Sequence, residues 1–171
     1  MGGVTPPRPL RAEDDRNGFD CGRESLNQWF RRRAWDNQLA NVSRTSVVCD
    51  AQTGRIAGYV TLSAAQIERG QLPKAAQRNR PDPLPAILLA QLAVDRARQG
   101  QGLARSLLYF ALTTAVHLSR ELGCFCVLTH PLDEAVRAFY ARFGFEDLPF
   151  DPRRAMAVRI AALEEAGFGE R

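Results

Sequence analysis

The clearest pattern of hydrophobic and polar positions lies in the middle of the chain, where an apolar run, a glycine-containing turn and a helical repeat follow one another. The run covers residues 87–94 and is short and apolar enough for a buried strand. From residue 102 to 122, apolar side chains recur at intervals of three and four, the spacing of one helix face. The pattern predicts a strand, a turn and a long helix that ends at Gly123.

The flanking sequence predicts further strands and helices by the same criteria. They are a helix at 24–40, strands at 46–49 and 56–63 joined by a hairpin loop, a strand at 124–129, a helix from about Asp133, and a final hairpin through Phe145 and residues 155–160. Prolines at 81, 83 and 85 predict an extended approach to the central strand. Residues 1–9 are expected to be frayed, and an edge strand is expected within 10–16.

A chain of 171 residues, 45% of them hydrophobic, is long and apolar enough for one domain, which we expect to span 1–171. The stretch 87–129 is a strand–helix–strand crossover, whose two strands run parallel, whereas the hairpins supply antiparallel strands. We therefore expect an α+β fold with a mixed central sheet and flanking helices.

The turn between the central strand and the long helix has the chemistry of a phosphate site. It reads Gln99-Gly100-Gln101-Gly102-Leu103-Ala104 and places backbone N–H groups at the positive end of a helix dipole. Glycine suits this turn because it adopts positive φ and lets a phosphate approach the backbone. A Walker loop is excluded because GK[ST] is missing, and a dinucleotide-binding GxGxxG loop fails where Arg105 replaces the third glycine.

Charge and cysteine content narrow the choice of partners. The chain has 23 Lys and Arg against 19 Asp and Glu, a net charge of +4, and Lys74 is its one lysine. The planar guanidinium of arginine binds phosphate better than the lysine ammonium does, so the arginine pairs at 78 and 80 and at 96 and 98 suit a polyanionic substrate. A modest excess of positive charge also fits an ordinary solvated surface.

The four cysteines form no CxxC pair, and no metal site is expected. Neither a membrane-spanning run nor a leader is recognisable, so we expect a cytoplasmic protein.

Three segments, in this order, resemble the motifs of the GNAT N-acetyltransferases. They are Leu-Ala-Val-Asp at 92–95, the glycine turn, which matches Q/RxxGxG/A, and Ala-Phe-Tyr-Ala-Arg-Phe-Gly-Phe at 138–145. The resemblance implies a GNAT fold, in which two parallel strands of the mixed sheet splay apart and acetyl-CoA enters between them. It also implies that acetyl-CoA is bound by Leu92, Ala93, Val94, Gln99, Gly100, Gln101, Gly102, Leu103, Ala104 and Arg105.

The same resemblance gives Tyr140 the role of general acid, which protonates the departing CoA thiolate. The alternative is that Tyr140 is a half-buried aromatic residue beside Phe139 and Phe143. Backbone N–H groups at Ala93 and Val94 are the expected contacts of the oxyanion and the pantetheine.

The candidate base is less clear than the candidate acid. Many GNAT enzymes carry a Glu on the central strand, but residues 86–94 contain no carboxylate, and Asp95 at the strand end is the nearest one. His117 and His130 are the other candidates, and we expect both to be structural or exposed to solvent. A lysine amine with a pKa of ~10.4 is almost wholly charged at pH 7 and would benefit from a base, whereas an α-amino group at ~7.7–8.0 is partly neutral already. The sequence therefore favours an α-amine as the acceptor.

A longer series of matches covers nearly the whole chain. The segments named above are preceded by Phe-Asp-Cys-Gly at 19–22, Leu-Asn-x-Trp at 26–29, Arg-Thr at 44–45 and Gly-Tyr-Val-Thr-Leu-Ser at 58–63. Together they resemble the TacT-like acetyltransferase toxins of type II toxin–antitoxin modules. This resemblance implies acetylation of the α-amine of aminoacyl-tRNA, a block of translation, a ribbon-helix-helix antitoxin as partner, and a homodimer. The expected tRNA contacts are Arg78, Arg80, Arg96 and Arg98.

The chain departs from that family at two positions, and two other functions stay open. Gln91 stands where Arg or Lys is more usual, which weakens the expected tRNA contact, and Ala104 replaces the usual second glycine, which the wider GNAT pattern permits. An acetyltransferase for a small amine or a protein N-terminus needs the same cofactor site without the arginine surface. A non-catalytic acyl-CoA-binding or nucleic-acid-binding module would keep the fold without turnover.

Overall fold

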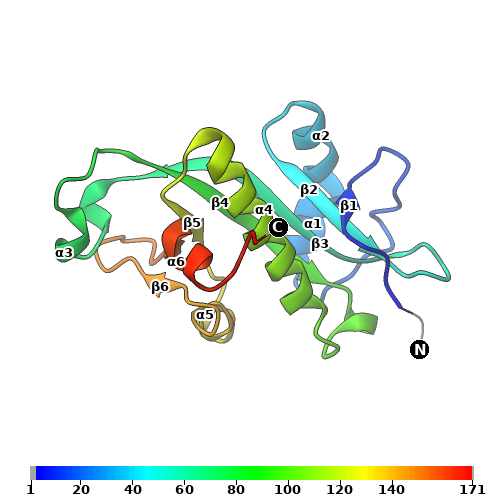
Figure 1. Cartoon of the computed structure of the whole chain (residues 1–171). Helices are drawn as coiled ribbons and strands as arrows, with labels where there is room; N and C mark the ends of the chain where they lie inside the picture. Colours follow the sequence, from blue (N-terminus) through cyan, green and yellow to red (C-terminus); the bar gives the residue numbers. More distant parts are fainter. Residues whose placement is uncertain (1–2, 171) are drawn as a thin grey trace. The chain divides into compact units, whose positions relative to one another are not determined.

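The structure, a computed structural model, describes residues 3–170. Its elements are β1 (Arg8–Pro9), α1 (Glu24–Arg32), α2 (Ala34–Leu39), β2 (Arg44–Cys49), β3 (Ile56–Ile67), η1 (Arg69–Gln71), α3 (Lys74–Gln77), β4 (Leu84–Val94), η2 (Arg96–Arg98), α4 (Leu103–Leu122), β5 (Cys126–Thr129), α5 (Glu134–Ala141), β6 (Glu146–Asp147), β7 (Met156–Arg159) and α6 (Ile160–Glu165), where η denotes a 3-10 helix. Figure 1 labels the α-helices and the strands β1 to β6. None of the helices in this part of the chain combines the length and the apolar character needed to cross a bilayer.

The chain forms two compact units. Unit 1 consists of the described residues up to Ser63 together with Ala90–Ala111, and unit 2 consists of Ala64–Leu89 together with the described residues from Leu112 onward. Three elements, β3, β4 and α4, contribute residues to both units.

Within residues 3–170 the strands form a mixed sheet in the order β1-β2-β3-β4-β5-β7-β6. The pair β4–β5 is parallel, whereas β1–β2, β2–β3, β5–β7 and β6–β7 are antiparallel. The predicted hairpin of β2 and β3 and the predicted crossover from β4 through α4 to β5 are both confirmed. The mixed sheet of the expected GNAT fold is therefore present.

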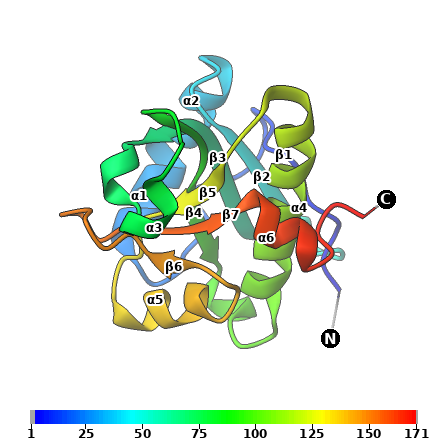
Figure 2. The ribbon, with the colours of Figure 1, turned by 60° about the vertical axis from the view of Figure 1, so that its left-hand side comes forward.

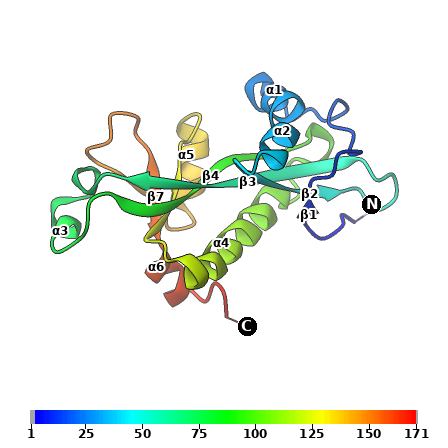
Figure 3. The same cartoon turned by 90° about the horizontal axis from the view of Figure 1, so that it is seen from above.

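In unit 1, α1 and α2 lie on one face of β2 and β3, and the first part of α4 lies on the opposite face (Figure 3). The core under α1 is aromatic: the rings of Phe30 and Tyr59 stack with their centroids 4.1 Å apart, and Phe19 packs edge-on against both. The buried Tyr59 hydroxyl donates to Leu26 O at 2.9 Å, so its polar end is satisfied. This packing holds α1, and the segment before it, on the sheet.

The single helix predicted at 24–40 is wrong in one respect, because the structure has two helices that meet at Arg33. Arg33 has φ −118° and ψ −32°, outside the range of a regular helix. Trp29 and Trp35 both pack against the core of unit 1. On one continuous helix these two side chains would point about 120° apart. The break lets both tryptophans reach the same core.

The expectation of a frayed N-terminus is also wrong for the described residues. Thr5 N donates to Cys49 O at 2.8 Å, and β1 pairs with β2 through Arg8 and Pro9. The edge strand thus lies before the stretch 10–16 in which it was expected. Proline is tolerated here because an edge strand needs hydrogen-bond donors on one side only.

In unit 2, β5 and β7 lie between α5 on one face and α6 on the other (Figure 3). Figure 2 shows the short β6 beside α5, and an ion pair joins Arg137 of α5 to Asp147 of β6. Buried Leu84, Ala86, Cys126 and Leu128 belong to a hydrophobic core cluster of this unit. The predicted helix after Asp133 and the final hairpin are confirmed. Helix α6 has no counterpart among the predicted elements.

Candidate functional site

Strand β4 continues beyond its parallel pairing with β5. The last pair in the register is Leu89 with Thr129, and β4 runs on to Val94. This continuation belongs to unit 1 and contains Leu92, expected to bind acetyl-CoA, and Ala93 and Val94, whose backbone N–H groups are the expected contacts of the oxyanion and the pantetheine. The side chains of Ala93 and Val94 are buried, so a ligand beside this stretch meets the backbone.

The glycine turn (residues 99–104) connects η2 to the start of α4 in unit 1. Gly100 has φ +76° and Gly102 has φ +82°, as the sequence predicts for a phosphate-binding turn. A Cβ added at either glycine would meet no atom within 4 Å. The glycines are therefore needed for their backbone conformation, and the turn leaves open space beside them. The 20-residue helix α4 begins directly after them, so its positive dipole end is at the turn.

The residues of the turn divide between the core and the surface. Leu103, one of the residues expected to bind the cofactor, is buried, so only its backbone N–H could take part in that binding. Gln101 and Arg105 are exposed, and the Arg105 guanidinium lies over the Tyr109 ring at 5.7 Å. Ala104 is partly buried. With these positions, the expected phosphate contacts fall mainly to the backbone of the turn.

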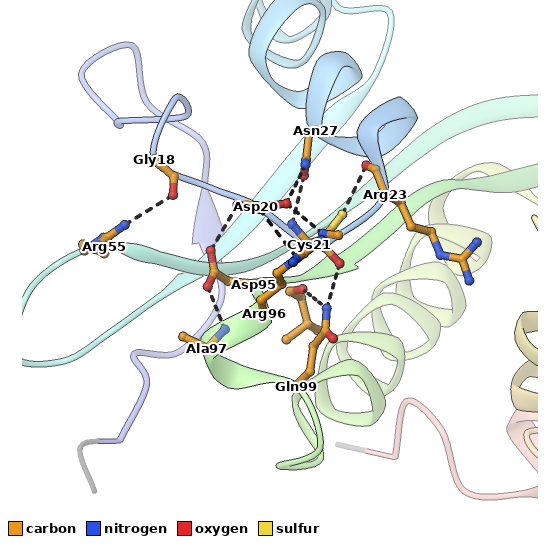
Figure 4. A network of polar contacts seen from close by, with 12 residues as sticks. Gly18, Asp20, Cys21, Arg23, Asn27, Arg55, Asp95, Arg96, Ala97 and Gln99 are labelled. Atoms are coloured by element: carbon orange, nitrogen blue, oxygen red, sulfur yellow. Dashed lines mark hydrogen bonds and ion pairs between the residues drawn. The ribbon is translucent and has the colours of Figure 1, made fainter.

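Gln99 holds the turn in place from within the protein. Its amide nitrogen donates to Val94 O at 2.9 Å and to Cys21 O at 2.8 Å (Figure 4). A primary amide has two N–H groups, and both are used here. An arginine can supply the same donors but a carboxylate cannot, which explains why the motif takes either Gln or Arg at this position.

Tyr140 is buried in unit 2, with an exposed fraction of 4%. Its ring packs against Phe139 and Phe145, with centroid separations of 5.4 Å and 5.2 Å. A hydrogen bond joins its hydroxyl to that of Thr129, and Thr129 donates to Leu89 O at 3.1 Å. Burial raises the pKa of Tyr140 to about 12, so the phenol keeps its proton at neutral pH.

The candidate bases are engaged or exposed. Asp95 accepts from Ala97 N at 3.0 Å and from Asp20 N at 3.1 Å, so both of its oxygens hold backbone N–H groups. His117 is exposed on α4. His130 is half-buried, and burial, with the positive charge of Arg153, lowers its pKa. Among the described residues its Nδ1 has no hydrogen-bond partner. No group of three or more His, Cys, Asp and Glu residues that could hold a metal occurs in that part of the chain.

The four arginines predicted to contact tRNA differ in how they are held. Arg78 in unit 2 is exposed, and Arg96 in unit 1 has a side chain 67% exposed. Arg98, with a side chain only 15% exposed, forms an ion pair with Asp50 of the β2–β3 loop, so phosphate contact by Arg98 would have to replace that pair. Arg80 donates to Ala76 O at 2.7 Å and lies over the ring of Phe125.

Three residues without a predicted role contribute to these arrangements. Asp20 and Asn27 hold the segment that accepts the hydrogen bond of Gln99, and Thr129 holds Tyr140. Asp20 and Asn27 stand in motifs that resemble the toxin family, which was the available signal. For Thr129 the sequence offers none, because only the strand register brings it beside Leu89.

Comparison with known proteins agrees with this architecture. A model described as an acetyltransferase (GNAT) domain matches residues 43–147. A tRNA-acetylating toxin of Mycobacterium tuberculosis is 38% identical over 158 residues, which are 92% of this chain and 94% of the relative. The solved structure of AtaT complexed with acetyl-methionyl-tRNAfMet has a TM-score of 0.88 and 28% identity, and covers 96% of this chain and 99% of that one. AtaTR bound with AcCoA has a TM-score of 0.83 and 28% identity, with coverages of 95% and 97%. Because the domain model matches more than half of the residues and the mycobacterial relative matches almost all of them, the chain belongs to the GNAT acetyltransferase family.

Proposed function

We propose that this protein transfers the acetyl group of acetyl-CoA to the α-amine of aminoacyl-tRNA, and that it blocks translation as the toxin of a toxin–antitoxin pair. The observation that carries the proposal is the open turn with two left-handed glycines between β4 and α4. It is found in a chain 38% identical to a tRNA-acetylating toxin. We assign this activity to one domain spanning 1–171.

The glycine turn fits the pyrophosphate of acetyl-CoA. The space beside Gly100 and Gly102 lets phosphate oxygens approach backbone N–H groups at the start of α4. The backbone of Leu92, Ala93 and Val94 suits the amide groups of pantetheine, because β4 continues there beyond its last pair with β5. Main-chain recognition of this kind places few demands on side chains.

Tyr140 is the proposed acid. Acetyl-CoA supplies the acetyl group as a thioester, and the neutral amine nitrogen forms the C–N bond while the C–S bond breaks with both electrons on sulfur. Tyr140 gives its proton to this sulfur, and the proton that the nitrogen loses restores the phenol. The products are the N-acetyl amide and the CoA thiol. The raised pKa of about 12 keeps Tyr140 protonated before the transfer.

The site suits an acetyl acceptor whose amine is already partly neutral at pH 7. Strand β4 carries no carboxylate, and Asp95 is held by two backbone N–H groups. An α-amine has a pKa of ~7.7–8.0, so a usable fraction is neutral at pH 7 without a protein base. The aminoacyl end of charged tRNA presents such an amine.

The remaining parts of the proposal concern partners. Arg78 and Arg96 are the principal tRNA contacts, because their guanidinium groups are exposed, and Arg80 and Arg98 contribute only if they leave their present contacts. Resemblance to the toxin family supports a ribbon-helix-helix antitoxin as partner and a homodimer. The protein acts in the cytoplasm, where charged tRNA is found. Light scattering on the purified protein tests the dimer.

The function is tested with labelled acetyl-CoA and total tRNA, charged and uncharged, alongside peptides with free N-termini and small amines. We expect label on charged tRNA alone, and we expect hydrolysis of the aminoacyl ester bond to release this label from the tRNA. Label on peptides or small amines, with none on charged tRNA, would refute the proposal in favour of another GNAT substrate.

A matched pair of glycine variants tests the cofactor site. Gly102→Glu places a carboxylate and a strained residue where the pyrophosphate binds, and should abolish acetyl-CoA binding. Gly54→Glu is the control, since Gly54 also has positive φ and open space, but lies in the β2–β3 loop. Equal affinities in the two variants, measured by calorimetry, would remove the turn from the site.

A further inference from the structure

Asn27 is a buried amide on α1 whose polar atoms are used within unit 1. Its side chain is 3% exposed. The amide nitrogen donates to Asp20 Oδ1 at 2.8 Å, and the amide oxygen accepts from Cys21 N at 2.9 Å. A buried polar group satisfied at both ends favours a single arrangement of its partners. Asn27 therefore sets the conformation of the 19–22 segment, which precedes α1.

This segment is bonded in turn to the residues that lead into the glycine turn. Asp20 O accepts from Arg96 N at 2.9 Å, and Asp20 N donates to Asp95 Oδ2 at 3.1 Å. Cys21 O accepts from the Gln99 amide at 2.8 Å. Figure 4 shows these bonds arranged around Asp20 and Cys21, with Asn27 on the opposite side. The two residues held by Asn27 thus anchor three of the five positions before the first glycine.

The charge of Asp20 adds to the same connection. Its carboxylate accepts from Gly22 N at 2.8 Å as well as from Asn27, and the Arg96 Nε lies 3.6 Å from its other oxygen. The N–H of Gly22, the Asn27 amide and the Arg96 guanidinium together lower the pKa of Asp20. The carboxylate therefore stays ionised at neutral pH, and both of its oxygens are in use.

We propose that Asn27 is a positioning residue for the acetyl-CoA site, acting through Asp20 and Cys21 on the residues that fix the glycine turn. The inference rests on the proposed function in taking that turn as the acetyl-CoA site, and goes beyond it by giving a role to a side chain that touches no ligand. Loss of Asn27 frees the 19–22 segment, so the acceptors for Arg96 N and the Gln99 amide lose their fixed places. Ligand binding then has to order the turn as well.

The test is Asn27→Ala, measured by calorimetry of acetyl-CoA binding and by steady-state kinetics. We expect the dissociation constant and the KM for acetyl-CoA to rise on the order of tenfold. At saturating acetyl-CoA, kcat should stay within about threefold of the parent, because the proposed acid Tyr140 is untouched.

Gln38→Ala is the matched control. Gln38 is also a buried amide of unit 1, and its oxygen accepts from Thr45 N at 2.8 Å, with no bond to the 19–22 segment. Both variants lose a buried side-chain to backbone hydrogen bond, so both should lower Tm by roughly 2–6 °C. Only Asn27→Ala should weaken acetyl-CoA binding. Equal weakening in the two variants would overturn the inference, because it would reflect general destabilisation.

Two further outcomes separate this inference from the function on which it rests. If the parent protein binds no acetyl-CoA, the proposed function fails and the inference fails with it. If the parent binds and Asn27→Ala binds equally well, only the inference fails. Should Asn27→Ala not fold, Asp20→Ala replaces it, since Asp20 has a side chain 56% exposed and removing it takes away the acceptor of Asn27. Unchanged affinity in folded Asp20→Ala would then overturn the inference.

Discussion

Replacing Tyr140 by Phe removes one oxygen from a buried site and leaves the ring in place. The contacts with Phe139 and Phe145 are ring contacts, so they persist in the variant. Thr129 loses its hydrogen bond with the phenol but still donates to Leu89 O. The loss of one neutral hydrogen bond costs about 0.5–1.5 kcal/mol, so Tm should fall by roughly 1–6 °C. The fold and the cofactor turn should survive.

The effect on rate should be much larger than the effect on stability. General acid catalysis contributes ~10²–10⁴-fold, so kcat should fall within that range while acetyl-CoA affinity changes little. The raised pKa of Tyr140 determines at which stage of the reaction its proton moves. Complete transfer from a phenol with a pKa of about 12 to a thiolate with the ordinary pKa of ~8.5 is uphill by roughly 5 kcal/mol. The proton should therefore move while the C–S bond is breaking, as the sulfur becomes basic.

The assay is single-turnover acetylation of charged tRNA with Tyr140→Phe, beside Thr129→Val as control. Thr129→Val loses the bond to Leu89 O and disturbs the same site, but keeps the phenol. It should be at least as destabilised as Tyr140→Phe and yet lose less than about tenfold in rate. If Tyr140→Phe acetylates within threefold of the parent, or no more slowly than Thr129→Val, Tyr140 is not the acid.

Four further outcomes are expected. The value of kcat/KM should rise between about pH 6.5 and 8.5 as the amine loses its proton, and show no fall by pH 10, because the pKa of Tyr140 is about 12; a falling limb below pH 9 would indicate another acid. Gln99→Glu should weaken acetyl-CoA binding at least tenfold by calorimetry, whereas Gln99→Arg, which keeps the donors, should stay within about threefold. Arg78→Gln and Arg96→Gln should each reduce the log–log salt slope of tRNA binding by ~0.7–0.9, and an unchanged slope would exclude a phosphate contact. The pKa of His130 is lower in the folded protein than in the unfolded chain, so the unfolded chain binds more protons below about pH 6.5 and the free energy of unfolding falls as the solution is acidified through that range. In His130→Gln, the dependence of Tm on pH between about pH 5 and 7 should therefore be weaker than in the parent.

The features that the sequence predicts well depend on neighbouring residues. Gly100 and Gly102 adopt positive φ because of the local turn, and Asp133 caps α5 by accepting from Val136 N three residues later. The helix α4 follows from a periodic pattern 20 residues long. In each case the information that determines the structure lies in one continuous stretch of sequence.

The features that were missed depend on partners far away in the chain. Arg98 looks like a free phosphate ligand in the sequence, but its partner Asp50 is 48 positions away in a hairpin loop. Tyr140 and Thr129 come together through the packing of α5 and the register of β5, neither of which leaves a local pattern. Trp29 and Trp35, on either side of the break at Arg33, share one core, and such a contact is set by the tertiary fold.

The interleaving of the two units has a consequence for synthesis on the ribosome. Residues 64–89, which belong to unit 2, are made between the two segments of unit 1, so unit 1 stays incomplete until Ala111 has been added. At ~5–20 residues per second, the intervening stretch delays the second segment by roughly one to five seconds. During this delay the apolar residues of β2 and β3 lack the β4 and α4 residues against which they pack in the complete unit. The nascent chain should therefore recruit chaperones most strongly while those residues emerge, and neither unit can be isolated by a single cut in the chain.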